Sequence, residues 1–452
     1  MTTVLPILMF VALGGLMFSS YPVAFILAGL AFVFALTGWL LGGFEIIEFY
    51  NVIGRIWDPL QNLTLIAVPC FIYMGVMLER SEIAKDLLFA LQMLLRRVPG
   101  GLALSITLMS TIIAAITGIV GASVVMMTMI ALPTMLRLGY HPTLATGTIA
   151  ASSTLGILIP PSILLVFMSE MLAISEGVLF AAALFPGLVL SGLYLIYIFS
   201  VSLCVPRLAP PLDPWAAGPS WAELGRLALK GLLPPMVLIA VVLGSIFAGI
   251  ATITESAAVG ALGATFLAWV RGRLNFAILN ESLQRSALMI GMIFLLVMGA
   301  TAFSYVFRVL GGDEVILRLV DVGTLGSWGV MVVLMATVFV MGFFFDILEI
   351  LLIVVPVFAP IVERLDFGGY LPQDDVIYWF ATLVAVNLQT SFLTPPMGLA
   401  LFYLKSAAPA EVSMRQIYLG IIPFVGLQIL CVAIVMTLPQ IAMWLPHALF
   451  NY

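Results

Sequence analysis

The stretch ASSTLGILIPPS, residues 151–162, places two serines, a threonine and a glycine ahead of two adjacent prolines. A proline has no amide hydrogen, so in a helix it leaves the carbonyl four residues earlier without its usual partner. Pro160 and Pro161 therefore free the carbonyls of Gly156 and Ile157. In lipid, a freed carbonyl is unfavourable unless another group binds it. If this segment lies in a membrane, it predicts a broken helix that is surrounded by polar groups.

The rest of the chain is apolar enough to cross a membrane many times. Its 452 residues are 63% hydrophobic and 9% charged, and the mean hydropathy is +1.23. A helix needs roughly 20 apolar residues to span a bilayer. Continuous runs of this kind indicate an all-α polytopic membrane protein rather than a barrel of alternating strands. Such runs are Val4–Ser20, Val23–Gly42, Val178–Leu203, Leu232–Ile250 and Ile417–Thr437.

Several other classes of protein find little support in the composition. The first residues, MTTVLPILMF, lack the basic segment of a cleavable signal peptide, so we expect the first helix to direct insertion. The three cysteines are scattered and predict neither a disulfide framework nor a CxxC metal site. Two histidines are too few for a haem pair or a three-histidine metal centre. We expect no nucleic acid, no organic cofactor and no metal other than sodium.

The chain contains a second copy of the opening motif. The segment VPRLAPPLDPWAAGPSWAELGR (205–226) reads as an extramembrane linker that separates two unequal halves. After it comes VNLQTSFLTPPMGLALF (386–402). Paired broken helices at corresponding positions indicate the midplane binding site of a transporter. The alternative is that both proline pairs only shape helix packing. Aligning Pro160-Pro161 with Pro395-Pro396 sets Ser152 against Asn387, Thr154 against Gln389 and Gly156 against Ser391.

A second pair of matching segments precedes the two motifs. Residues 102–136 and 328–362 are each about 35 residues long, which exceeds one span but is short for two spans and a loop. We therefore expect each segment to form a re-entrant hairpin that enters and leaves on the same side. Backbone of this kind is tolerated at membrane depth where it is buried or lines a cavity.

The flanking charges predict that the two hairpins enter from opposite faces. Arg96, Arg97 and Arg137 flank the first hairpin and place its ends on the cytoplasmic side by the positive-inside rule. The second hairpin has few basic neighbours. This arrangement is an inverted repeat, and it puts both termini on the outer side. The acidic residues around the second hairpin are Asp313, Glu314, Asp321, Asp366, Asp374 and Asp375.

Three segments have one charged face and one apolar face: residues 44–60, 81–97 and 274–288. This pattern fits helices that lie flat at the membrane surface and connect moving and static parts. An ordinary loop helix would show the same pattern.

Freed carbonyls, hydroxyls and amide oxygens are suitable ligands for Na+, and half-helix N-termini favour an anionic substrate. The two halves therefore predict two cation sites with a carboxylate site between them. The first cation site comprises Gly121, Ser123, Ser152, Ser153 and Gly156. The second comprises Asp346, Asn387, Gln389 and Thr390. The carboxylate site comprises Thr154, Pro160, Ser391 and Pro395.

Asp346 is the charge that most indicates function, because an ionisable side chain at hairpin depth is costly. A local helix cap at the hairpin tip would explain it without an ion. Glu349 lies one helical turn later and either shares the site or supports it. For Glu255 we expect a place at a helix start, with Thr252 or Thr254 as the cap.

The two motifs, together with MGFFFDILEILLIVVPVFAPI (341–361), resemble the large, DctM-like membrane subunit of tripartite ATP-independent periplasmic (TRAP) transporters over essentially the whole chain. The resemblance implies an elevator-type carrier of the ion transporter superfamily, with two inverted repeats. It also implies Na+ as the coupling ion and a bacterial inner-membrane location. The implied partners are a separate small four-helix membrane subunit and a periplasmic binding protein that delivers a small organic acid, such as a 2-oxo acid.

This interpretation divides the chain into six parts. The parts are N-terminal scaffold helices (1–62), a first repeat with hairpin and broken helix (63–204), a cytoplasmic linker (205–230), scaffold helices with an interfacial arm (231–285), a second repeat with hairpin and broken helix (286–415) and a C-terminal helix (416–452).

Two alternative functions remain. One is a stand-alone Na+-coupled anion carrier of the same superfamily without a binding protein. The other is a membrane enzyme, for which only Asp346 and Glu349 approach a catalytic pair.

Overall fold

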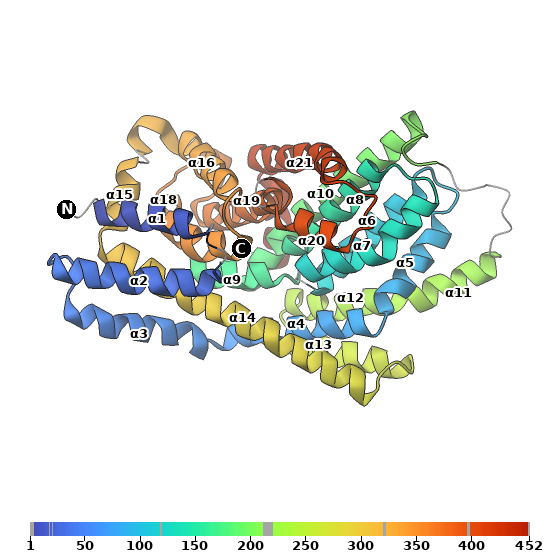
Figure 1. The fold of residues 1–452 in the computed structure, drawn as a ribbon, viewed down its shortest axis with the longest axis horizontal. Coiled ribbons are helices and arrows are strands. Elements are labelled where there is room, and N and C mark those ends of the chain that lie inside the picture. Colours follow the sequence, from blue (N-terminus) through green and yellow to red (C-terminus); the bar gives the residue numbers. More distant parts are fainter. Residues whose placement is uncertain are drawn as a thin grey trace.

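The structure is a computed structural model that describes residues 4–17, 19, 21–117, 120–210, 220–319, 322–395 and 398–450. Within these ranges the regular elements are helices, and no strand occurs (Figure 1). The predicted all-α fold is confirmed.

The elements of the first half follow the chain from the N-terminus to the linker. They are α1 (Val4–Met17), α2 (Val23–Leu40), α3 (Ile46–Gln61), η1 (Leu63–Ile66), α4 (Ala67–Arg80), α5 (Ile83–Leu94), α6 (Gly101–Thr117), α7 (Val120–Arg137), α8 (Pro142–Ser153), η2 (Thr154–Ile157), α9 (Ile163–Leu172) and α10 (Glu176–Cys204).

The second half begins after the linker. Its elements are α11 (Trp221–Gly231), α12 (Leu233–Phe247), α13 (Ile253–Val270), α14 (Phe276–Val309), α15 (Gly312–Leu319), α16 (Val322–Met341), α17 (Ile347–Glu349), η3 (Ile350–Val354), α18 (Val355–Val362), η4 (Gly368–Tyr370), α19 (Gln373–Leu393), α20 (Leu399–Ala407), α21 (Met414–Thr437) and α22 (Gln440–Phe450).

Many of these helices are suited to a bilayer. Among the described residues, seven helices are long and apolar enough to cross a membrane, and α11 with α12 forms an eighth if that bent pair is one span. The helix starts follow local rules. Thr252 caps α13, since its hydroxyl accepts from the Glu255 amide (3.2 Å) and the Glu255 carboxylate accepts from the Thr252 amide (2.8 Å). The expected cap role of Glu255 is thus confirmed.

Both predicted hairpins are present. In the first, α6 and α7 pack together, and the side chain of Tyr140, just after α7, lies against the backbone of Leu102 and Ala103 at the start of α6. In the second, Ser327 at the start of α16 accepts from the Asp366 amide (3.2 Å), which follows α18. Each pair of helices therefore leaves on the side where it entered.

The two broken helices are also present and are built differently. The first changes from α8 into the short turn η2, passes the proline pair and resumes as α9. The second, α19, is a continuous helix to Leu393 and resumes as α20 at Leu399. The contacts repeat in the two halves, because α8 packs against α21 while α19 packs against α10.

One contact marks the relation between the halves. The hydroxyl oxygen of Thr154, which donates to the Ala151 carbonyl (2.8 Å), lies 3.5 Å from the side-chain oxygen of Gln389. These residues are partners in the alignment of the two proline pairs. A residue that touches its own repeat partner lies near the axis that relates the repeats, so this pair marks the centre of the molecule.

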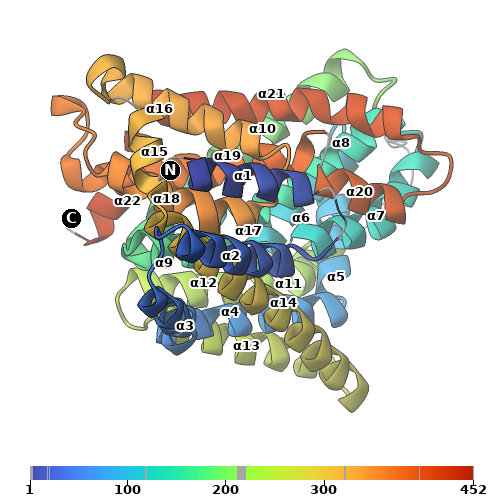
Figure 2. The ribbon, with the colours of Figure 1, turned by 60° about the vertical axis from the view of Figure 1, so that its left-hand side comes forward.

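The remaining helices form a second layer. Helices α2, α3 and α4 pack against α14, and α13 packs against α4 (Figures 1 and 2). Through α4 and α14 this layer contacts the first hairpin, α9 and the second hairpin. Of the three predicted surface segments, α3 and α5 form separate helices. Residues 274–288 do not form one. They are mostly the first part of the 34-residue α14, because no proline interrupts the helix before its long apolar part.

Candidate functional site

A cavity of about 830 Å³ lies where the two layers meet the hairpin tips. One wall comes from α4, α5 and α14, and the other from both hairpins and both broken helices. Its volume is in the range of sites that bind small molecules. The fold thus brings segments from both halves of the chain to one chamber.

Three helices begin at this cavity. Ile163 begins α9, Ile347 begins the helical segment Ile347–Val362 and Leu399 begins α20, and all three residues line the cavity. A helix N-terminus carries unpaired amide hydrogens and a partial positive charge unless a side chain caps it. Asp346 caps the Ile347 end, whereas α9 and α20 have no side-chain cap, so the ends of α9 and α20 favour an anion.

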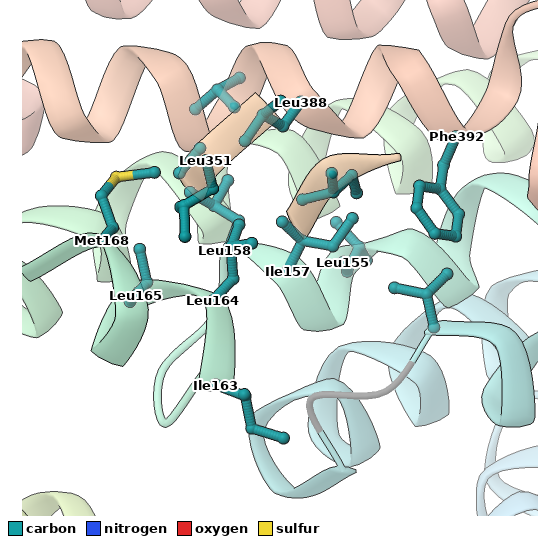
Figure 3. Packing of buried hydrophobic residues seen from close by; sticks show 14 of the residues in the cluster. Leu155, Ile157, Leu158, Ile163, Leu164, Leu165, Met168, Leu351, Leu388 and Phe392 are labelled. Atoms are coloured by element: carbon teal, nitrogen blue, oxygen red, sulfur yellow. The ribbon is translucent and has the colours of Figure 1, made fainter. Parts of the chain in front are cut away.

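The first broken helix answers the question raised by its prolines. Pro161 frees the carbonyl of Ile157, and the hydroxyl of Ser162 donates to that carbonyl at 2.7 Å. The peptide bond between Pro160 and Pro161 is cis. Figure 3 shows that the apolar side chains around the break, including Leu155 and Leu158, pack toward Leu351, Leu388 and Phe392 of the second half. The freed carbonyl is thus stabilised by the chain itself, inside an apolar interface.

Replacing Ser162 with alanine is expected to destabilise the fold by about 1–3 kcal/mol, because the buried Ile157 carbonyl loses its donor. The measurement is the unfolding midpoint of the purified protein in detergent. Ser169→Ala is the matched control, since the Ser169 hydroxyl only bonds the Val166 carbonyl of its own helix (2.8 Å). Equal midpoints for the two variants would show that the carbonyl of Ile157 needs no side-chain donor.

Asp346 lies at the tip of the second hairpin and lines the cavity. Its carboxylate accepts from the Ile347 amide (2.7 Å), and the buried Glu349 accepts from the Asp346 amide (3.0 Å). The two residues form a capping box, which confirms both the cap interpretation of Asp346 and the supporting place of Glu349. The carboxylate that caps this helix therefore also lines the cavity.

The remaining residues of the second predicted cation site are buried in α19. The amide nitrogen of Asn387 donates to the Met335 carbonyl of α16 (2.7 Å), which joins α19 to the hairpin. The hydroxyl of Thr390 donates to the Asn387 carbonyl (2.6 Å), and Gln389 faces Thr154. No hydrogen bond among the described residues joins these three side chains to Asp346.

The structure brings together part of the first predicted cation site. Ser123 of the hairpin and Ser153 at the end of α8 border one small space. The Ser153 hydroxyl is buried without a hydrogen-bond partner among the described residues. The Ser152 hydroxyl instead donates to Thr148 of its own helix (2.6 Å). Gly156 is buried in η2, and Gly121 lines the large cavity.

None of the four residues predicted to bind the carboxylate lines the large cavity. Thr154 and Pro160 are buried, and Ser391 packs against Gly342 of the hairpin tip. Pro395 is exposed in the turn after α19. Their neighbours Ile157, Phe392 and Leu399 face the chamber instead. The predicted residues lie within a few positions of the lining, and their role stays a prediction.

Several lining residues were missed by the sequence argument. Tyr403 of α20 lines the cavity, and a side chain at Gly121 would meet its ring. Arg80, Lys85 and Arg285 line the same chamber from the other layer. Tyr403 could have been predicted as a site residue, because it ends the LALFY segment directly after the second proline motif. No sequence feature distinguishes the three cationic residues as site residues, since they lie in or next to ordinary amphipathic segments.

The described ranges hold seven apolar spans, and two hairpins and two broken helices meet at one cavity. Together these features define a multi-pass membrane transporter. The family profile of the "Tripartite ATP-independent periplasmic transporter, DctM component" matches residues 9–441, and the chain belongs to this family. The resemblance noted in the sequence is confirmed.

Relatives of known name are similar over most of their length. The C4-dicarboxylate TRAP transporter large permease protein DctM of Pseudomonas aeruginosa is 29% identical over 394 residues, covering 87% of this chain and 88% of that protein. The ectoine permease TeaC of Halomonas elongata is 29% identical, covering 91% and 92%. The sialic acid permease SiaM of Vibrio cholerae is 27% identical, covering 97% of both. The family consists of transport proteins, so the enzyme alternative is set aside.

A solved structure shares the fold. The YdaH transporter of Alcanivorax borkumensis superimposes with a TM-score of 0.59 at 11% identity, covering 88% of this chain and 89% of that one. At this identity the likeness concerns the fold alone.

Proposed function

We propose that this large permease subunit imports a small organic anion by Na+ symport. The observation that supports the anion is the meeting of two uncapped helix N-termini, those of α9 and α20, at one cavity of about 830 Å³. The named relatives serve C4-dicarboxylates, ectoine and sialic acid, so substrates differ within the family.

Na+ would bind at the two hairpin tips. The first site would use Ser123 and Ser153 with backbone carbonyls, and the second would use the carboxylate of Asp346. Both are hard oxygen ligands, and Asp346 adds the negative charge that a cation prefers. A bound cation beside these N-termini would raise the affinity for a carboxylate and thereby couple the two fluxes.

The movement would be that of an elevator. The layer of α2, α3, α4, α13 and α14 would stay in place, while the hairpins and broken helices would slide past it with their cargo. The cavity is lined by Arg80, Lys85 and Arg285, residues that the positive-inside rule assigns to the cytoplasm. On this assignment the cavity would open to the cytoplasm, as in an inward-facing carrier, and both termini would lie on the outer face of the bacterial inner membrane.

The partners would be a separate small four-helix membrane subunit and a periplasmic binding protein that delivers the acid. The other possibility is a stand-alone Na+-coupled anion carrier of the same superfamily. The named relatives are subunits of TRAP transporters, which favours the tripartite form.

The test is uptake of radiolabelled organic acids into proteoliposomes that contain this chain and its small subunit. An inward Na+ gradient is imposed, with and without the cognate binding protein, and choline replaces Na+ in the control. We expect uptake to require both Na+ and the binding protein. Uptake that needs Na+ but ignores the binding protein would favour the stand-alone carrier, and uptake in choline would contradict Na+ coupling.

A further inference from the structure

The second hairpin contains two prolines that free carbonyls of their own. Pro356 and Pro360 lie four residues apart on the segment that leads away from the hairpin tip. Neither proline has an amide hydrogen, so the carbonyls of Leu352 and Pro356 lack the donor that an α-helix supplies four residues later. Leu352 and Pro356 are both buried. At membrane depth such carbonyls need another donor.

Side chains of α14 supply both donors. The hydroxyl of Ser304 donates to the Leu352 carbonyl at 3.3 Å, and the guanidinium of Arg308 donates to the Pro356 carbonyl at 2.9 Å. Ser304 and Arg308 are four residues apart, so they lie on the same face of α14. The two carbonyls have the same spacing. The two helices therefore meet in register through two hydrogen bonds.

These hydrogen bonds join the two layers of the molecule. Helix α14 packs along α2 and α4, whereas Leu352 and Pro356 belong to the second hairpin. The bond from Arg308 has a charged donor, and such bonds are stronger than those between neutral groups. Arg308 also lies 4.0 Å from Asp313, but an ion pair between half-exposed side chains contributes little. The carbonyl of Pro356 is thus the main partner of Arg308.

We propose that Ser304 and Arg308 form a latch that holds the hairpin-bearing layer in the position of this structure. The proposal rests on the proposed function, because a latch acts only if the layers slide. Sliding of the hairpin along α14 breaks both hydrogen bonds and leaves two buried carbonyls without these donors. The latch therefore shifts the equilibrium between the two positions toward this one. Ser304 and Arg308 are positioning residues that act without contacting ion or substrate.

The test measures the populations of the two positions. Spin labels are attached at two exposed sites, one in each layer, through Asn280→Cys on α14 and Glu411→Cys before α21. The three native cysteines are replaced by alanine. The distance between the labels is measured by pulsed electron paramagnetic resonance on this chain with its small subunit in nanodiscs, in NaCl and in choline chloride. One population should have the distance of this structure, and a second should report the other position.

Removal of both donors should shift these populations. Ser304→Ala combined with Arg308→Met is expected to lower the ratio of the first population to the second about tenfold. Arg308→Lys keeps a charged donor, so Arg308→Lys with native Ser304 should stay within about threefold of the native ratio.

Two matched controls separate the latch from general effects on α14. Thr301→Val removes a hydroxyl that bonds only the Val297 carbonyl of its own helix (2.8 Å). Asp313→Asn removes the ion pair of Arg308 and leaves its bond to the Pro356 carbonyl. Neither control should change the ratio. The unfolding midpoint of each variant reports on the fold.

The outcomes separate this proposal from the proposed function. If two distances are present and the double variant has an unchanged or higher ratio, the latch is wrong and the elevator movement stands. An equal shift in the double variant and in Thr301→Val also overturns the latch. A single distance in both salts, for the native protein and for the double variant, overturns the latch and the elevator movement together, because the layers then do not slide.

Discussion

Replacing Asp346 with asparagine is expected to lower Na+-driven uptake about 100-fold, through loss of the negative charge at the tip of the second hairpin. Asparagine caps helices about as well as aspartate, so the capping box with Ile347 and Glu349 should survive and the fold should stay intact. The measurement is initial uptake as a function of Na+ concentration in proteoliposomes. The unfolding midpoint of the same preparation reports on the fold.

Two further variants make this result interpretable. Asp346→Ala removes the cap as well as the charge, so it should lose about 1 kcal/mol of stability in addition to transport. Asp313→Asn changes a half-exposed carboxylate 4.0 Å from Arg308, away from the cavity, and should leave uptake unchanged. If Asp346→Asn transports with native Na+ dependence, Asp346 is a helix cap only and the second cation site is wrong.

Replacing Gly420 with valine is expected to destabilise the protein by about 3 kcal/mol or more, because α21 and α8 touch backbone to backbone. A side chain at Gly420 would overlap the Thr143 carbonyl, and one at Gly147 would overlap the Gly420 carbonyl. Small residues allow such close crossings between membrane helices. The measurement is the yield of folded protein and its unfolding midpoint in detergent.

The control lies in the same helix. Gly426 has no atom within 4 Å of the position that a side chain would take, so Gly426→Val should change stability by no more than about 0.5 kcal/mol. Equal effects of the two substitutions would mean that the close crossing of α8 and α21 does not limit stability. The comparison is direct because both variants insert the same residue into one helix.

The sequence predicted the elements better than the side-chain directions. The repeat that the two proline pairs indicated agrees with the structure in two places. The ends of the second hairpin meet at Ser327 and Asp366, and Thr154 contacts Gln389. The inward direction of Thr154 and Ser391 was expected from their polarity. The cavity is lined instead by Ile157 and Phe392. The direction of a side chain around a helix axis cannot be extrapolated across a break in the helix. The sequence spacing therefore does not predict which residues near the prolines face the cavity.

The length of α14 was also beyond the sequence argument. Residues 274–288 have the charge pattern of a surface helix, yet they continue into the apolar half of a 34-residue helix. Packing against α2 and α4 along its length stabilises one continuous helix where the pattern alone suggested two. Local amphipathicity reports which face is polar and does not report whether the helix ends.

By itself the sequence determined that this protein is helical, crosses the membrane many times and carries two broken helices in inverted halves. Those conclusions follow from apolar runs, proline chemistry and repetition, which are properties of short segments. Tertiary structure alone decided that the N-termini of α9 and α20 share one cavity and that Tyr403 and Asp346 line it together with Ile157. These features depend on how segments about 200 residues apart or more meet, and no local pattern encodes that contact.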